Sequence, residues 1–128
     1  MNQALGIDLV SVPRLRALVL RWGDRLLERL FTADERAASS GARGLRWDSL
    51  AGRFAAKEAA KKVLAGQGHI MGWNEIEVRN GSHGEPLLLL HGRARAAAQC
   101  CGYDGFVVSI SHERDMAVAV VIAVPGIA

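Results

Sequence analysis

Residues 50–62, with the sequence LAGRFAAKEAAKK, constrain the fold more than any other stretch of this chain. Alanine, leucine, lysine, arginine and glutamate are all good helix formers, so this stretch predicts a helix. Asp48 lies just before it and can cap its N-terminus. We expect the helix to run from about residue 49 to residue 65 and to end at Gly66, with Gly68 close behind.

The side chains of this helix divide into an apolar stripe and a row of cations. Advancing 100° per residue places Ala51, Phe54, Ala55, Glu58 and Lys62 in one stripe about 80° wide. The cations Arg53, Lys57 and Lys61 follow one another along its flank. A carboxylate on an apolar face beside a row of cations suits a metal ion and a polyphosphate. The simpler interpretation is an ion pair between Glu58 and Lys62, worth roughly 0.2–0.5 kcal/mol.

Length and composition indicate one globular domain over residues 1–128, long enough to bury a core without disulfides. Cys100 and Cys101 are adjacent and form neither a spaced disulfide framework nor a CxxC metal pair. The N-terminus lacks the features of a signal peptide, and the longest apolar run, residues 116–124, is too short to span a membrane. We therefore expect a cytoplasmic protein without a membrane partner.

A strand is expected at residues 4–10, with Ile7 and Leu9 on one face. Gly6, Asp8 and Val10 lie on the other face, and aspartate is uncommon in strands. Asp8 either has a function, caps the next helix or simply ends the strand.

A helix should begin at Ser11 or Val12 and continue to about Leu30, with Gly23 loosening its middle. One of its faces carries Arg14, Arg21, Arg25 and Arg29. Such a stripe is either an ordinary solvated face or a docking surface for an acidic partner. A net charge of +3 and an aromatic content of 5% argue against nucleic acid as that partner.

The remaining pattern predicts an α+β fold with a mainly antiparallel sheet around the long central helix. Thr32 and Glu35 form a capping box, which opens a short helix to about residue 40 and is followed by a loop at residues 39–44. The other expected elements are strands at residues 74–79 and 87–90 joined by a turn, a helix at 92–101, and strands at 106–111 and 116–124.

Several of these segments together resemble holo-acyl-carrier-protein synthase, the small bacterial type of 4'-phosphopantetheinyl transferase. The matching segments are residues 6–10 (GIDLV), Phe31-Thr32 with Glu35, residues 50–59 (LAGRFAAKEA), residues 73–78 (WNEIEV), Gly84 with Pro86, and residues 109–112 (SISH). They cover nearly the whole chain in the family's order, and the block at residues 50–59 is the most specific of them.

The resemblance implies an activity, a fold and partners. Enzymes of this family move the 4'-phosphopantetheine arm of coenzyme A to a serine of apo-acyl carrier protein, use Mg²⁺ and release adenosine 3',5'-bisphosphate. The resemblance also implies a homotrimer with active sites between neighbouring subunits. Other interpretations remain: a silent homologue that binds the carrier without transfer, a transferase for polyketide carriers, and a basic nucleic-acid-binding protein.

The resemblance assigns Asp8 and Glu58 to the catalytic metal and Lys62 to the departing phosphate. Mg²⁺ prefers one or two protein carboxylates, with phosphate oxygens and water as its other ligands. A strand aspartate and a helix glutamate, each unusual alone, explain each other if they share an ion. The base that takes the serine proton is left open between a water on the metal and Glu58.

Further positions follow from the same resemblance. Residues expected to bind coenzyme A are Arg53, Phe54, Lys57, Lys61, Gly84, Pro86, Ser111 and His112. Arg14, Arg21 and Arg25 are expected to meet the acidic carrier protein. The chain departs from the family pattern at Glu85, where a lysine is usual, and in the turn at residues 65–68.

Overall fold

The computed structural model describes residues 4–65 and 70–126 of the chain. Its elements are β1 (Leu5–Ser11), α1 (Val12–Trp22), α2 (Asp24–Leu30), α3 (Ala33–Ala38), β2 (Ser40–Gly41), β3 (Gly44–Leu45), α4 (Trp47–Leu64), the single-turn helix η2 (Trp73–Glu75), β4 (Ile76–Asn80), β5 (Pro86–Leu90), α5 (Gly92–Cys100), β6 (Tyr103–Glu113) and β7 (Met116–Pro125). The strands in this part of the chain pair antiparallel, so the predicted α+β fold is confirmed.

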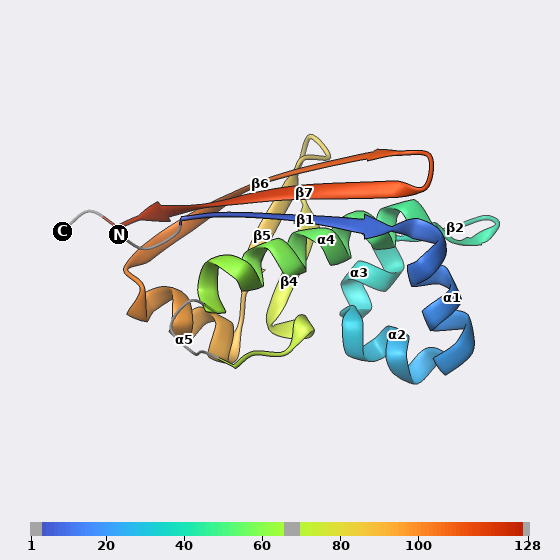
Figure 1. Ribbon diagram of the computed structural model, residues 1–128, viewed down its shortest axis with the longest axis horizontal. Coiled ribbons are helices and arrows are strands. Elements are labelled where there is room, and N and C mark those ends of the chain that lie inside the picture. The colour runs from blue at the N-terminus through green and yellow to red at the C-terminus, as the bar shows by residue number, and fades with distance from the viewer. Residues whose placement is uncertain (1–3, 66–69, 127–128) are drawn as a thin grey trace.

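Three long strands form the main sheet in the order β1-β7-β6. The sheet lies along one side of the molecule and the helices lie on the other, with α4 running beneath the strands (Figure 1). The β4–β5 hairpin forms a separate two-stranded sheet. Along β1, Asp8 lies opposite Ala119 of β7 and Val10 lies opposite Ala117, so Asp8 belongs to the inner face that covers α4.

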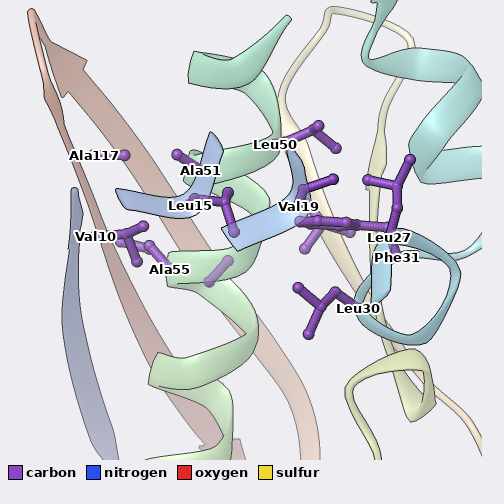
Figure 2. Packing of buried hydrophobic residues seen from close by; sticks show 13 residues of the cluster. Val10, Leu15, Val19, Leu27, Leu30, Phe31, Leu50, Ala51, Ala55 and Ala117 are labelled. Atoms are coloured by element: carbon purple, nitrogen blue, oxygen red, sulfur yellow. The ribbon is translucent and has the colours of Figure 1, made fainter. Parts of the chain in front are cut away.

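Small residues bring α4 unusually close to the sheet. Ala51 and Ala55 of α4 face Val10 and Ala117 of the sheet, and both alanines are fully buried (Figure 2). At Gly6 the approach is closest, because a Cβ atom there would lie 2.1 Å from the carbonyl oxygen of residue 59. The strand that carries Asp8 is therefore held directly against the helix that carries Glu58.

The first half of α4 also packs against α1 and α2. Leu50 of α4 and Phe31 are fully buried, and Val19 and Leu27 surround them (Figure 2). This packing fixes the two arginine-bearing helices beside the catalytic candidates on α4.

Two local expectations were wrong. The helix expected to reach Leu30 divides into α1 and α2 at Gly23, whose φ of 77° lies in the left-handed region that glycine adopts readily. The loop expected at residues 39–44 contains the short β2–β3 hairpin.

The central helix begins earlier than expected. It starts at Trp47, so Asp48 lies in its first turn, where Asp48 Oδ1 accepts a hydrogen bond from the Ser49 backbone (2.8 Å) and does not cap the helix. Ala65 caps its C-terminus. Gly66 and Gly68, which were expected to stop it, lie outside the described residues, as do residues 66–68 of the turn noted above.

The outer face of the main sheet is apolar, and no described residue of the chain covers it. Ile7, Leu9, Val107, Ile122 and Val124 keep between 42% and 63% of their surfaces exposed. Exposed apolar faces of this extent mark sites of association in proteins. Within residues 4–65 and 70–126, no helix is both long enough and apolar enough to cross a membrane.

Candidate active site

Asp8 and Glu58 line the same cavity, although they lie 50 positions apart in the sequence. Its volume is about 330 Å³, and Arg14, Leu15 and Phe54 contribute to its walls. The close packing of β1 on α4 produces this arrangement, because Asp8 points from the inner face of the strand towards the helix. The structure thus brings together the two predicted metal ligands and one predicted carrier-binding arginine.

Lys62 contacts Asp8 and not Glu58. Its Nζ donates to Asp8 Oδ1 (2.9 Å) and to the backbone carbonyl of Ile7 (2.8 Å). The simple i,i+4 ion pair with Glu58 is therefore not formed. More than half of the Lys62 side chain is exposed, so its ammonium stands at the open edge of the two carboxylates.

Glu58 has a different partner, the indole of Trp73, whose Nε1 donates a short hydrogen bond to Glu58 Oε1. Among the described residues, no protein group donates to Glu58 Oε2 or to Asp8 Oδ2. Each carboxylate therefore keeps one oxygen for another ligand.

This donor set fits Mg²⁺. The described residues hold no group of three or more histidine, cysteine, aspartate or glutamate side chains arranged for a metal. Mg²⁺ does not need such a cage, because it is commonly held by one or two carboxylates together with substrate phosphates and water. Asp8 and Glu58 supply that number of hard oxygen ligands beside a cation.

Lys57 lies in the interior, contrary to its predicted place at the phosphates of coenzyme A. Its ammonium is fully buried and lies 2.5 Å from Glu35 Oε1. It also donates to the backbone carbonyls of Leu30 (2.7 Å) and Trp73 (3.1 Å). Burial lowers the pKa of Lys57, and the neighbouring charge of Glu35 opposes that shift. The three donor directions of the ammonium are occupied by protein groups, so none is left for a phosphate.

A second cavity, of about 320 Å³, collects several of the residues expected at coenzyme A. Arg53, Gly84, Pro86 and His112 line it. Arg53 is 6% exposed, and burial lowers the pKa of its guanidinium despite the charge of Glu35. The cavity is therefore a concave site with a desolvated guanidinium in its wall, which suits a phosphate.

Arg53 is held in place by two polar neighbours that sequence reasoning missed. Its Nη1 donates to Ser49 Oγ (2.5 Å) and its Nη2 to Asn80 Oδ1 (3.4 Å), while its buried Nε has no partner among the described residues. Ser49 could have been found, because it precedes Arg53 by four residues on the same helix. Asn80 could not have been found, because it is the last residue of β4, 27 positions further along the sequence.

The two cavities lie on different sides of α4 and share no lining residue. Arg53 and Glu58 are five residues apart, which is a rotation of about 140° around the helix axis. Within one chain, the carboxylates and the phosphate-binding candidates are therefore separate.

Besides Lys57, two more predicted coenzyme ligands lie outside both cavities. Ser111 belongs to the outer face of β6 together with Val107, whereas the adjacent His112 points to the inner side, because neighbouring strand residues face opposite ways. Lys61 Nζ lies 4.0 Å from the centre of the Trp73 ring, in a cation–π contact.

Glu85, the departure from the family pattern, is folded back into its own turn. Its side chain lies over Gly81, where a Cβ atom would approach Glu85 Oε1 to 1.7 Å, and Glu85 Oε2 accepts from the His83 backbone (3.0 Å). The carboxylate is thereby directed into the turn, while its neighbours Gly84 and Pro86 line the cavity.

The arginine stripe borders an apolar groove of about 790 Å³ between α1, α2 and α4. Arg25 and Arg29 line this groove, and Leu15, Leu18 and Phe54 belong to both this groove and the carboxylate cavity. The guanidinium carbon of Arg21 lies 5.3 Å from the centre of the Trp22 ring. The groove therefore leads from the arginine stripe to Asp8 and Glu58.

Comparisons with known proteins agree on one family. The sequence model of the 4'-phosphopantetheinyl transferase superfamily matches residues 4–121. A holo-[acyl-carrier-protein] synthase of Desulforudis audaxviator is 45% identical over 120 residues, which cover 94% of this chain and 91% of the relative. A protein of the same name from Solidesulfovibrio magneticus is 45% identical over 124 residues, covering 95% of this chain and 98% of the relative.

Solved structures give the same result. The Helicobacter pylori holo-[acyl-carrier-protein] synthase in complex with coenzyme A is similar, with a TM-score of 0.79 at 30% identity, covering 93% of this chain and 98% of that one. The Bacillus anthracis synthase in complex with CoA (3',5'-ADP) has a TM-score of 0.73 at 31% identity, covering 96% of each chain.

Proposed function

The chain belongs to the 4'-phosphopantetheinyl transferase superfamily, its relatives identify it as a holo-acyl-carrier-protein synthase, and we propose that its reaction depends on Mg²⁺ held at Asp8 and Glu58. Its substrates are coenzyme A and apo-acyl carrier protein. The observation that carries this proposal is the cavity shared by Asp8 and Glu58 next to Lys62.

In the reaction, the carrier serine oxygen bonds to the phosphorus that bears the pantetheine arm. The bond from that phosphorus to the bridging oxygen breaks, and adenosine 3',5'-bisphosphate leaves with the electron pair. The serine proton passes to a base, for which Glu58 and a water at the metal are the two candidates. Lys62 would offset the charge of the departing phosphate, since its ammonium is exposed beside Asp8.

Asp8 and Glu58 would hold the metal through the oxygens that no described protein group occupies. Mg²⁺, when bound, neutralises the charge that develops on the phosphate oxygens during transfer. Most of the chain's own contribution is then positioning, because β1 and α4 hold both carboxylates on rigid elements.

Coenzyme A binding is assigned to the second cavity, with Arg53 and His112 for phosphates and Gly84 and Pro86 beside the nucleotide. The buried, pre-oriented guanidinium of Arg53 supports this assignment. Phe54, Lys61 and Ser111 stay predicted contacts of the bound coenzyme.

A homotrimer would join these parts into one site. In one chain the two cavities lie on different sides of α4, so a complete site needs the second cavity from a neighbouring subunit. The apolar outer face of the sheet supports such an assembly. Val107→Glu should lower the molar mass measured by light scattering from that of a trimer towards that of a single chain. Leu20→Glu, at an exposed position of α1, should leave the measured mass unchanged. An unchanged mass for Val107→Glu would contradict this interface.

The carrier protein would dock along α1 and α2. Arg14, Arg21 and Arg25 can meet an acidic helix, and the apolar groove between them and the carboxylate cavity can accept its apolar residues. Replacing Arg14 and Arg21 should raise the KM for the carrier and flatten its dependence on salt. Unchanged kinetics at low salt would exclude the stripe.

The deciding experiment is a mass spectrum of apo-acyl carrier protein after incubation with this protein, coenzyme A and Mg²⁺. We expect a mass gain of one phosphopantetheine, abolished by EDTA and by Glu58→Ala. Near-wild-type turnover of Glu58→Ala would refute the metal assignment. Coenzyme A binding without any mass gain, on carriers of fatty acid and of polyketide synthesis, would identify a silent homologue. A cytoplasmic location stays part of the same proposal.

A further inference from the structure

Trp73 is the direct protein partner of the Glu58 carboxylate. Its indole Nε1 donates to Glu58 Oε1, and among the described residues this is the hydrogen bond that the Glu58 side chain makes. We propose that Trp73 is a positioning residue that holds Glu58 in the orientation needed for the metal, an inference that rests on the proposed role of Glu58.

The geometry explains why Glu58 needs such a partner. The cavity wall is largely apolar, and although Ser11 and Arg14 also line it, no described group other than Trp73 donates to the Glu58 carboxylate. A glutamate side chain has several rotatable bonds, and fixing them costs conformational entropy. Because the indole N–H engages Oε1, the carboxylate loses part of its rotational freedom while Oε2 keeps no donor among the described residues.

Trp73 is itself anchored on several sides. Its ring packs against Phe54 at 6.2 Å between ring centres, and Lys61 Nζ lies 4.0 Å above it. Its backbone carbonyl accepts from buried Lys57 (3.1 Å). The next residue, Asn74, donates from its side chain to the Glu28 carbonyl (2.7 Å). An anchored donor loses little freedom when it binds, so it can impose its geometry on Glu58.

This arrangement also gives Lys61 a role other than direct contact with a phosphate. Its ammonium over the ring stabilises the plane in which the indole lies, because a cation is attracted to the ring face. The cation row and the carboxylate are thereby linked through Trp73.

Residues that orient metal ligands typically change metal affinity by about 10–100-fold when they are replaced. Trp73→Phe keeps an aromatic ring against Phe54 and removes only the donor and part of the ring. We therefore expect the Kd for Mn²⁺, measured from the EPR signal of the free ion with the enzyme–coenzyme A complex, to rise at least about 10-fold. Trp47→Phe makes the same change near the start of α4 and should leave the Kd unchanged.

Transfer kinetics supply a second measurement. In Trp73→Phe, the Mg²⁺ concentration for half-maximal rate should rise by a similar factor, and saturating Mg²⁺ should restore most of kcat. Glu58→Ala should not be restored. A loss of kcat that no Mg²⁺ concentration restores would overturn the positioning role.

The hydrogen bond can also be observed without altering Trp73. The indole N–H resonance that disappears in Trp73→Phe identifies this residue in a ¹H–¹⁵N spectrum. In Glu58→Gln it should move upfield, because a neutral amide oxygen is a weaker acceptor than a carboxylate. The same resonance is the one that persists in both Trp22→Phe and Trp47→Phe, since the chain has three tryptophans, so an unmoved resonance would overturn the proposed bond even if Trp73→Phe failed to fold.

The outcomes separate this inference from the proposed function. If Glu58→Ala abolishes Mn²⁺ binding and Trp73→Phe leaves it intact, the positioning role is refuted while the metal site stands. If Glu58→Ala leaves Mn²⁺ binding intact, the metal assignment fails and the role of Trp73 fails with it.

Discussion

Replacing Lys57 by methionine should destabilise the fold and not weaken coenzyme A binding directly. Methionine preserves the apolar stem of the side chain and removes the ammonium. The ammonium is fully buried and contacts the Glu35 carboxylate and the backbone carbonyls of Leu30 and Trp73. All three acceptors would lose a donor that water cannot replace at a site without exposure.

The expected loss follows from these contacts. Removing one partner of a buried ion pair costs about 3–5 kcal/mol, because the other charge is left uncompensated. Glu35 keeps the hydrogen bonds from Thr32 N (2.9 Å) and Val78 N (2.8 Å), so we place the loss near the middle, at about 4 kcal/mol. Small domains are stable by only about 5–15 kcal/mol, so this is a large fraction of the total.

Urea unfolding followed by circular dichroism measures this loss, and a thermal scan should show a Tm lower by roughly 12–20 °C for a chain of this length. Lys61→Met is the matched control one turn further along α4. It removes an ammonium from the Trp73 ring face, a contact worth about 0.5–1 kcal/mol at exposed sites.

Two results would refute the reasoning. A loss below about 1 kcal/mol in Lys57→Met, similar to the control, would mean that the ammonium does not make the buried pair. A variant that stays stable but shows a much higher KM for coenzyme A would support the phosphate contact predicted from the family resemblance.

Two other perturbations test the packing of β1 and the pairing of η2. Gly6→Ala should lower the free energy of unfolding, measured with urea, by about 2–3 kcal/mol or more, because its Cβ would meet the Ala59 carbonyl oxygen at 2.1 Å. In the control Gly52→Ala the new Cβ meets only a side-chain methyl group at 2.8 Å, so the loss should be smaller. Side-chain hydrogen bonds from Arg93 lower the pKa of Glu75 to about 2 from its ordinary 4.5, so this pair adds stability above pH 4.5 that is lost as the pH falls towards 2. Glu75→Gln should therefore be less stable than the wild type at neutral pH, and the difference should shrink over that acid range; a constant difference would contradict the assignment.

Much of the fold could be predicted from local patterns in the sequence. The helix formers of α4, the alternation of β4 and the turn before β5 each specify their element with few neighbours involved. The sequence did not predict that the helix would end at Gly23, because the apolar periodicity continues across the glycine. Only the backbone conformation of Gly23 reveals that the chain changes direction there.

The partners of the site residues could not be predicted in the same way. Periodicity places Glu58 on a face of α4, but it says nothing about which later segment covers that face. Trp73 comes from η2 after the end of the helix, and it contacts α4 through Lys57, Glu58 and Lys61. The sequence contains both residues of the bond but no local signal that joins them.

The cation row on α4 shows why a helical stripe is not yet a binding site. Each i,i+4 step advances about 40° around the axis, so Arg53, Lys57 and Lys61 turn progressively to different surroundings. Arg53 lines a cavity, Lys57 enters the core beside Glu35, and Lys61 lies on the Trp73 ring. Three cations with the same spacing therefore have three different surroundings: a ligand cavity, the core and the ring of a positioning residue. If this division is correct, charge-removing substitutions along the row should separate in effect, with coenzyme A affinity lost at the first position, stability at the second and metal affinity at the third.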